Sequence, residues 1–194
     1  MFKNIVAVAL LSVSLTGCLS VKSYVDPTLP KVDYASLKPA ENKHPVQLLY
    51  EFQNQGAVNA NAVKLTQGTA VDVLKKSNLF SEVAVAPATA DYKLFVTINN
   101  VPVTKDAAAK GFATGLTFGL AGNTVTDGYE CKVTYQAPGK TAVSKDYKHA
   151  LHSTIGNASG PAGLQPYKPE DAARKIVEDL MLNALNDLDK EGAL

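Results

Sequence analysis

Apolar residues follow the spacings of strands and helices over most of the chain after residue 44. Alternating or β-branched runs predict strands over residues 45–52, 82–85, 91–98, 124–135 and 141–154. Apolar residues at spacings of three and four predict two amphipathic helices, one over residues 61–76 and one that begins at Pro169 and ends near Gly192. The chain after residue 44 therefore has the elements of one mixed domain.

Polar residues at the predicted helix ends support these assignments. We expect Asn59 or Asn61 to cap the first helix, and Asn78 to close it in the left-handed conformation. Pro169 suits the first turn of the second helix because its missing N–H costs no hydrogen bond there. The two acidic residues that follow it favour the positive end of the helix dipole.

The order of the elements predicts an α+β fold. It suits a mostly antiparallel, curled sheet of about five strands with two amphipathic helices on one face. Residues 137–140 form a turn sequence that joins the last two strands as a hairpin. We expect a single α+β domain over residues 45–194, a length that can bury a hydrophobic core.

Residues 1–17 have the pattern of an export signal. Lys3 gives the start a positive charge, and residues 5–15 are almost wholly apolar. This apolar stretch is shorter than the about 20 residues that a membrane-spanning helix needs. It ends in Leu15-Thr16-Gly17-Cys18, which resembles the lipobox of bacterial lipoproteins. We therefore expect residues 1–17 to be a lipoprotein signal peptide that is cleaved before Cys18.

The lipobox resemblance implies a membrane anchor. Cys18 would carry acyl chains such as palmitate, and each buried CH₂ group contributes about 0.8 kcal/mol to membrane binding. Leu19 at the second mature position implies sorting to the outer membrane with the domain facing the periplasm. The alternatives are an ordinary secretory signal that ends near a cysteine by chance, or an uncleaved anchor.

Residues 18–44 lack a sustained apolar period and contain Pro27, Pro30 and Pro39. We interpret them as the lipidated cysteine followed by a flexible tether. An extended segment of about 25 residues reaches up to about 80 Å, so such a tether would let the domain stand off the membrane.

Two short phrases resemble small periplasmic lipoproteins of Gram-negative bacteria whose function is unassigned. The first is Leu74-Lys75-Lys76-Ser77-Asn78-Leu79-Phe80 at the end of the first helix, and the second is Ala90-Asp91-Tyr92-Lys93-Leu94 at the start of a strand. The resemblance extends over about residues 45–135. The resemblance supports the predicted fold, and we assign no functional residue of this chain from it.

A glycine-rich segment, residues 107–122, is the part of the mature chain least like an ordinary domain. Its glycines recur every four residues and would form one smooth helix face, although each costs about 1 kcal/mol relative to alanine in a helix. The segment is a loop or hairpin over the sheet, a segment that dips into the bilayer, or a docking surface for a partner protein. The residues expected to make a partner or membrane contact are Gly111, Phe112, Gly115, Leu116, Phe118 and Gly119.

Charge and motif content argue against several functions. The chain has 19 basic and 18 acidic residues and no basic stripe, so we expect no nucleic-acid partner. It lacks Gly-x-Ser-x-Gly, a phosphate-binding loop and His-Glu-x-x-His, so we assign no catalytic residue and no cofactor.

The cysteine and histidines outside the N-terminal segment read as structural residues. With Cys18 lipidated, Cys131 has no disulfide partner, and strand alternation places it on a buried, inert face with Tyr129 and Val133. His149 and His152 fall on opposite faces of one strand, which is poor geometry for a shared metal ion, so we expect no metal site. We expect them to be surface residues or residues with satisfied hydrogen bonds.

These expectations together favour a membrane-anchored lipoprotein that is not an enzyme. Its predicted function is that of an accessory or assembly subunit of a cell-envelope complex, with an envelope protein as partner. The alternative is a small-molecule or lipid carrier domain tethered to the outer membrane, with an apolar cleft between sheet and helices. A hydrolase of envelope polymers would need a cluster of acidic residues or histidines that the sequence does not show.

Overall fold

The computed structural model describes residues 20–40, 42–103 and 124–194. The described residues form a seven-stranded sheet and two α-helices. The strands are β1 (Val21–Val25), β2 (Pro45–Asn54), β3 (Ala57–Val58), β4 (Glu82–Val85), β5 (Tyr92–Pro102), β6 (Thr124–Gln136) and β7 (Val143–Ile155). The helices are α1 (Ala60–Lys76) and α3 (Pro169–Lys190), with a short 3-10 turn η1 (Tyr34–Ser36) before β2.

The sheet has the strand order β1-β7-β6-β5-β2-β3, and β4 also pairs with β2. Four strand pairs are antiparallel, whereas β2 runs parallel to both β4 and β5. The α+β class and the mostly antiparallel sheet are therefore confirmed. The sheet has seven strands where about five were expected, because the two-residue β3 and the edge strand β1 carry too little periodic signal to stand out.

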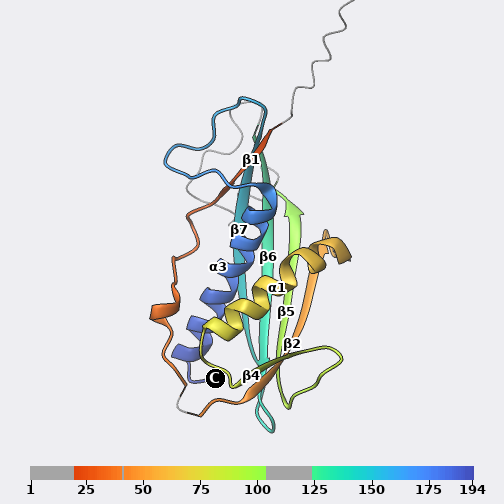
Figure 1. Ribbon diagram of the computed structural model, residues 1–194, viewed down its shortest axis with the longest axis vertical. Coiled ribbons are helices and arrows are strands. Elements are labelled where there is room, and N and C mark those ends of the chain that lie inside the picture. The colour runs from red at the N-terminus through yellow and green to blue at the C-terminus, as the bar shows by residue number, and fades with distance from the viewer. Residues whose placement is uncertain (1–19, 41, 104–123) are drawn as a thin grey trace, which may run out of the picture.

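Both helices cover the same face of the sheet (Figure 1). Leucine, isoleucine and valine side chains of α3 interlock with the alternate apolar residues of the central strands, and many of these side chains are fully buried. Examples are Leu48, Leu94, Ile98, Val133, Ile176, Leu180 and Leu185. The space between sheet and helices, as far as the described residues show it, is filled by this core.

The helix ends match the expectations from sequence. The side chain of Asn59 accepts a hydrogen bond from the backbone N–H of Ala62 at 3.0 Å and so caps α1. Asn78 has a φ angle of 60°, the left-handed conformation that lets the chain leave the helix. Pro169 occupies the first turn of α3, followed by Glu170 and Asp171.

Residues 20–40 differ from the flexible tether that the sequence predicts. Val21–Val25 form β1, which pairs in antiparallel register with the end of β7. Further along, Leu37 is buried against the core, and the Tyr34 hydroxyl donates to the Glu178 carboxylate on α3 at 3.2 Å. The prolines follow the edge strand β1, where they interrupt no sheet hydrogen bond. The extended segment after β1 packs on the core without a regular spacing of apolar residues.

Candidate functional site at the β1 end of the sheet

The predicted lipidation residue Cys18 and the glycine-rich segment 107–122 are both joined to described residues at one end of the sheet. We define the β1 end as residues 20–25, 124–126 and 151–167, at the top of Figure 1, whereas β4 and the C-terminus lie at the opposite end. Cys18 lies outside the described residues. Ser20, two positions later, already belongs to the β1 end, because its carbonyl accepts a hydrogen bond from the Gly156 N–H at 2.8 Å.

The predicted contact segment 107–122, with Gly111, Phe112, Gly115, Leu116, Phe118 and Gly119, also lies outside the described residues. The residues that flank it are described. Val103 donates its backbone N–H to the Thr126 carbonyl at 3.3 Å, and Pro102 pairs with Asp127 in the β5–β6 register. The chain therefore enters and leaves this segment close to the β1 end.

A buried chain of polar side chains joins three strands at the β1 end. His152 on β7 lies between Asp26, which follows β1, and Thr126 on β6. The His152 Nε2 to Asp26 Oδ2 distance is 3.0 Å, and the His152 Nδ1 to Thr126 Oγ1 distance is 2.9 Å. Because an ionised carboxylate only accepts, Nε2–H donates to Asp26, and a neutral ring then accepts from the threonine hydroxyl at Nδ1.

The Asp26 carboxylate is held in place from its other oxygen as well. Its Oδ1 accepts the backbone N–H of Thr28 at 2.7 Å and also the Thr28 hydroxyl. Burial alone would raise the pKa of Asp26, but the hydrogen bonds from His152 and Thr28 outweigh this effect and lower the pKa below 3.8. The carboxylate is therefore charged at neutral pH although the residue is only 2% exposed.

The second histidine of β7 points to the helices. His149 Nε2 lies 3.5 Å from the Asp179 carboxylate on α3, and Lys175 approaches the same carboxylate at 2.8 Å. Burial would raise the pKa of Asp179, yet contacts with His149 and Lys175 lower it overall. The prediction that His149 and His152 face opposite sides of β7 is confirmed, and both are buried near an acidic residue that is distant in sequence. The expectation of satisfied hydrogen bonds holds for His152 but is wrong for His149, because neither of its buried ring nitrogens has a hydrogen-bond partner among the described residues.

Neither histidine cluster has the form of an exposed catalytic site. Asp26, His152 and Thr126 combine a carboxylate, an imidazole and a hydroxyl, but Asp26 and His152 are almost completely buried, so these groups cross-link the end of β1 with β7 and β6. The described residues contain no group of three or more histidine, cysteine or acidic residues that could hold a metal ion. Cys131 is 2% exposed, and burial raises the pKa of its thiol to about 12, as suits an inert strand residue.

The cavities described lie away from the apolar space between sheet and helices. One of about 250 Å³ lies between α1 and α3 and is lined by charged residues such as Asp72, Arg174 and Glu178. Another, of about 570 Å³, lies against the sheet face opposite the helices, beside Asn99, Lys132 and other polar residues. No helix in the described part of the chain has the length and apolar character to cross a membrane.

Comparison with known proteins identifies no family for this chain. No family model and no curated protein matches it. Solved structures resemble it, among them those of three proteins. A single-substitution variant of the PelC dodecamer from Paraburkholderia phytofirmans is 14% identical, with a TM-score of 0.36 over 88% of this chain and 97% of that one. The rare lipoprotein B from Shewanella oneidensis is 13% identical, with a TM-score of 0.32 over 76% of this chain and 92% of that one. A minor lipoprotein from Acinetobacter baumannii is 11% identical, with a TM-score of 0.38 over 79% and 95%. At such identities and scores the likeness carries no argument about what this chain does.

Proposed function

We propose that this chain is an outer-membrane lipoprotein that acts, without catalysis of its own, as an accessory or assembly subunit of a cell-envelope complex. The anchor rests on the sequence: an apolar export signal over residues 1–17, the Leu15-Thr16-Gly17-Cys18 phrase, and Leu19 after the acylated cysteine. Acyl chains on Cys18 then hold the protein in the periplasmic leaflet.

The observation that carries the proposal is the position of β1. This strand begins at Val21, only three residues after Cys18, and pairs along its whole length with β7. Three residues extend at most about 11 Å, against about 80 Å for a free segment of about 25 residues. A domain on so short a link stays beside the membrane surface, as suits a subunit that supports a partner embedded in that membrane.

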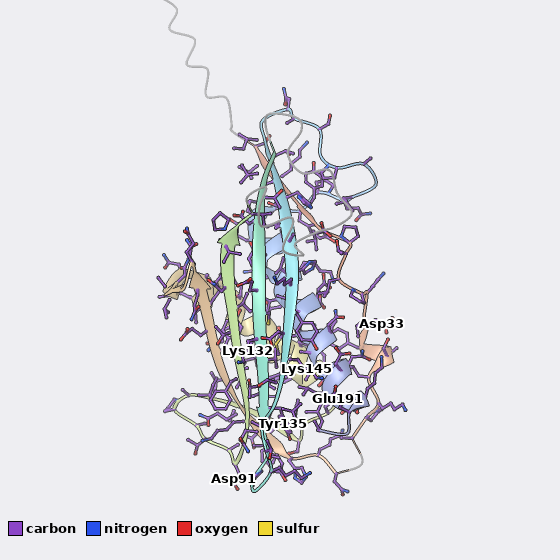
Figure 2. The ribbon with its side chains drawn as sticks, turned by 180° about the vertical axis from the view of Figure 1, so that it is seen from behind. Asp33, Asp91, Lys132, Tyr135, Lys145 and Glu191 are labelled. Carbon is purple, nitrogen blue, oxygen red and sulfur yellow. The ribbon has the colours of Figure 1, made fainter. Side chains whose placement is uncertain are left out.

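The sheet also offers a broad surface for a partner. The face away from the helices, seen in Figure 2, carries Phe95, which is 42% exposed, beside polar residues such as Thr97 and Lys132. Glu130 and Lys148 form an ion pair at 3.8 Å on the same face. Phe95 is the candidate contact point on this face, because aromatic residues are enriched at protein interfaces.

The anchor and the partner need separate tests. Growth with a labelled palmitate analogue should label the wild-type chain in the membrane fraction, and the Cys18→Ser variant should lose both the label and the membrane association. Labelling that persists in Cys18→Ser would disprove the anchor at this residue.

For the partner, a photo-crosslinking residue replaces Phe112, Phe118 or Phe95 in cells, with Val58 as an exposed control on β3. A discrete protein adduct from Phe112, Phe118 or Phe95, absent from Val58, is the expected result. Lipid adducts alone, or adducts of equal intensity at all four positions, would contradict the accessory-subunit function.

A further inference from the structure

Exposed apolar side chains gather at the β1 end. Among the described residues five large apolar side chains are strongly exposed, and three of them, Val21, Val125 and Ile155, belong to this end. Their exposed fractions are 39%, 53% and 44%. Burying such side chains is favourable in proportion to their apolar area, so a cluster of them marks a contact surface.

The three side chains share one face of the sheet. Val21 lies directly opposite Ile155 in the β1–β7 register. Val125 lies opposite Ser153 in the β6–β7 register, and Ser153 is two residues from Ile155. Because strand side chains alternate with a period of two, Val21, Val125 and Ile155 all point to the same side, as neighbours.

The β1 end is also nearly free of formal charge. Lys22 is the only lysine, arginine, aspartate or glutamate in residues 20–25, 124–126 and 151–167, and of the two acids that border these ranges Asp26 is buried and Asp127 half-buried. The opposite end of the sheet carries charges of both signs, with Glu82 and Asp91 beside Lys93, and Figure 2 shows Asp91 at that end. Anionic lipid headgroups attract a lysine and repel carboxylates, so the β1 end, with Lys22 and no exposed carboxylate in its ranges, has a charge pattern that suits a lipid surface.

We propose that Val21, Val125 and Ile155 form a membrane-contact tip that inserts into the headgroup layer of the bilayer that holds the Cys18 anchor, with Lys22 at the lipid phosphates. This inference rests on the proposed lipidation of Cys18. It adds an orientation: the β1 end faces the lipid, and the end with β4 and the C-terminus points away from the membrane (Figure 1).

The short link between the proposed anchor and the sheet favours the bilayer as the partner of this surface. Val21 follows Cys18 by three residues, which span at most about 11 Å. The polar layer on each side of the hydrocarbon core is about 5–8 Å thick. The first residue of β1 is therefore held in this layer or just outside it, and Ile155 and Val125 are held there with it by the strand pairing.

The test measures the depth of single spin labels in the full-length, lipidated protein, reconstituted in vesicles of phosphatidylethanolamine with some phosphatidylglycerol. Nitroxides are attached to Val125→Cys, Ile155→Cys and the matched control Val58→Cys, an exposed valine on β3. Cys131 is buried and does not compete for the label. Flotation with the vesicles, lost in Cys18→Ser, first establishes the anchor.

We expect the ratio of collisions with oxygen to collisions with a water-soluble nickel complex to be several-fold higher at positions 125 and 155 than at position 58. Equal ratios at all three positions in protein that floats would overturn the membrane-contact tip and leave the anchor intact. Strong spin–spin coupling between labels at 125 would show that a second copy covers the tip, and would also overturn it. Wild-type protein that fails to float would refute the lipid anchor, and the orientation with it.

Discussion

Replacing Asp26 should show how firmly β1 is held to the rest of the domain. In the Asp26→Ala variant the buried His152 Nε2–H loses its acceptor, and the N–H and hydroxyl of the exposed Thr28 lose theirs as well. Leaving a buried donor without an acceptor costs about 1–3 kcal/mol, and the two lost hydrogen bonds from Thr28 to the charged carboxylate add to this cost. Because whole domains unfold at a cost of about 5–15 kcal/mol, this loss is a large share of the stability.

The Asp26→Asn variant keeps the shape but loses the charge. It retains one carbonyl oxygen as an acceptor, so the expected loss is smaller than for Asp26→Ala, about 1.5–3 kcal/mol, the range for a hydrogen bond to a charged group. Asp33→Ala is the matched control, since Asp33 is exposed and accepts from the N–H and hydroxyl of Ser36 at 3.1 and 3.0 Å. Loss of such a cap costs about 1 kcal/mol.

The assay is urea unfolding of the chain without residues 1–17 and with Cys18→Ser, followed by tyrosine fluorescence and circular dichroism. The eight tyrosines give the signal, because the protein has no tryptophan. A loss for Asp26→Ala no larger than that for Asp33→Ala would refute the reasoning that a buried charge network holds β1.

The difference in stability between the wild type and the Asp26→Asn variant should depend on pH. The pKa of Asp26 is lower in the folded protein than its ordinary value of 3.8, so ionised Asp26 stabilises the fold at pH values above 3.8. This contribution is lost as the pH falls through the folded-state pKa. The stability difference between wild type and Asp26→Asn should therefore be constant near neutral pH and shrink below about pH 4. A difference that grows on acidification would contradict this sign.

Two further predictions concern close packing and burial. Gly160→Ala should destabilise the protein by about 1–3 kcal/mol, because the new Cβ would overlap the ring of Tyr24, which is only 5% exposed. Gly68→Ala, in α1 with open space around it, should instead stabilise by about 0.5–1 kcal/mol, and thermal melting of both variants checks the contrast. Cys131 should react with a thiol reagent only at the rate of global unfolding, since its pKa is raised to about 12 by burial; rapid labelling of the native Cys18→Ser protein would contradict this.

The helices and strands after residue 44 could be predicted because each depends on the spacing of apolar residues and on capping residues close to each other in the sequence. The period of α1 and its ends at Asn59 and Asn78 depend on residues within a few positions of each other, and the structure has them as expected. Strand β5 is similarly marked by the alternation of Leu94, Val96 and Ile98, all buried.

The polar network at the β1 end could not be predicted in the same way. Asp26 and His152 are separated by 126 positions, and no local pattern links a carboxylate in a proline-containing segment to a histidine on a distant strand. The only signal was indirect: two histidines in a strand-like run of a chain with three in all. Alternation correctly separated His149 from His152, but it gave no indication that Asp179 lies near His149 or that Asp26 hydrogen-bonds His152 and so compensates the burial of that ring.

The link between the proposed anchor and the domain illustrates why such a contact matters for function. Composition alone makes residues 18–44 a tether, since the prolines and scattered apolar residues have no period. Pairing of five residues of β1 with β7, extended by the Asp26 N–H to the Ala150 carbonyl at 3.0 Å, shortens the free part of that tether to a few residues. With the proposed lipid on Cys18, the pairing of β1 and the buried charge beside it would set the distance between the lipid and the domain. Weakening Asp26 should therefore lower stability and also lengthen the reach of the domain from its membrane.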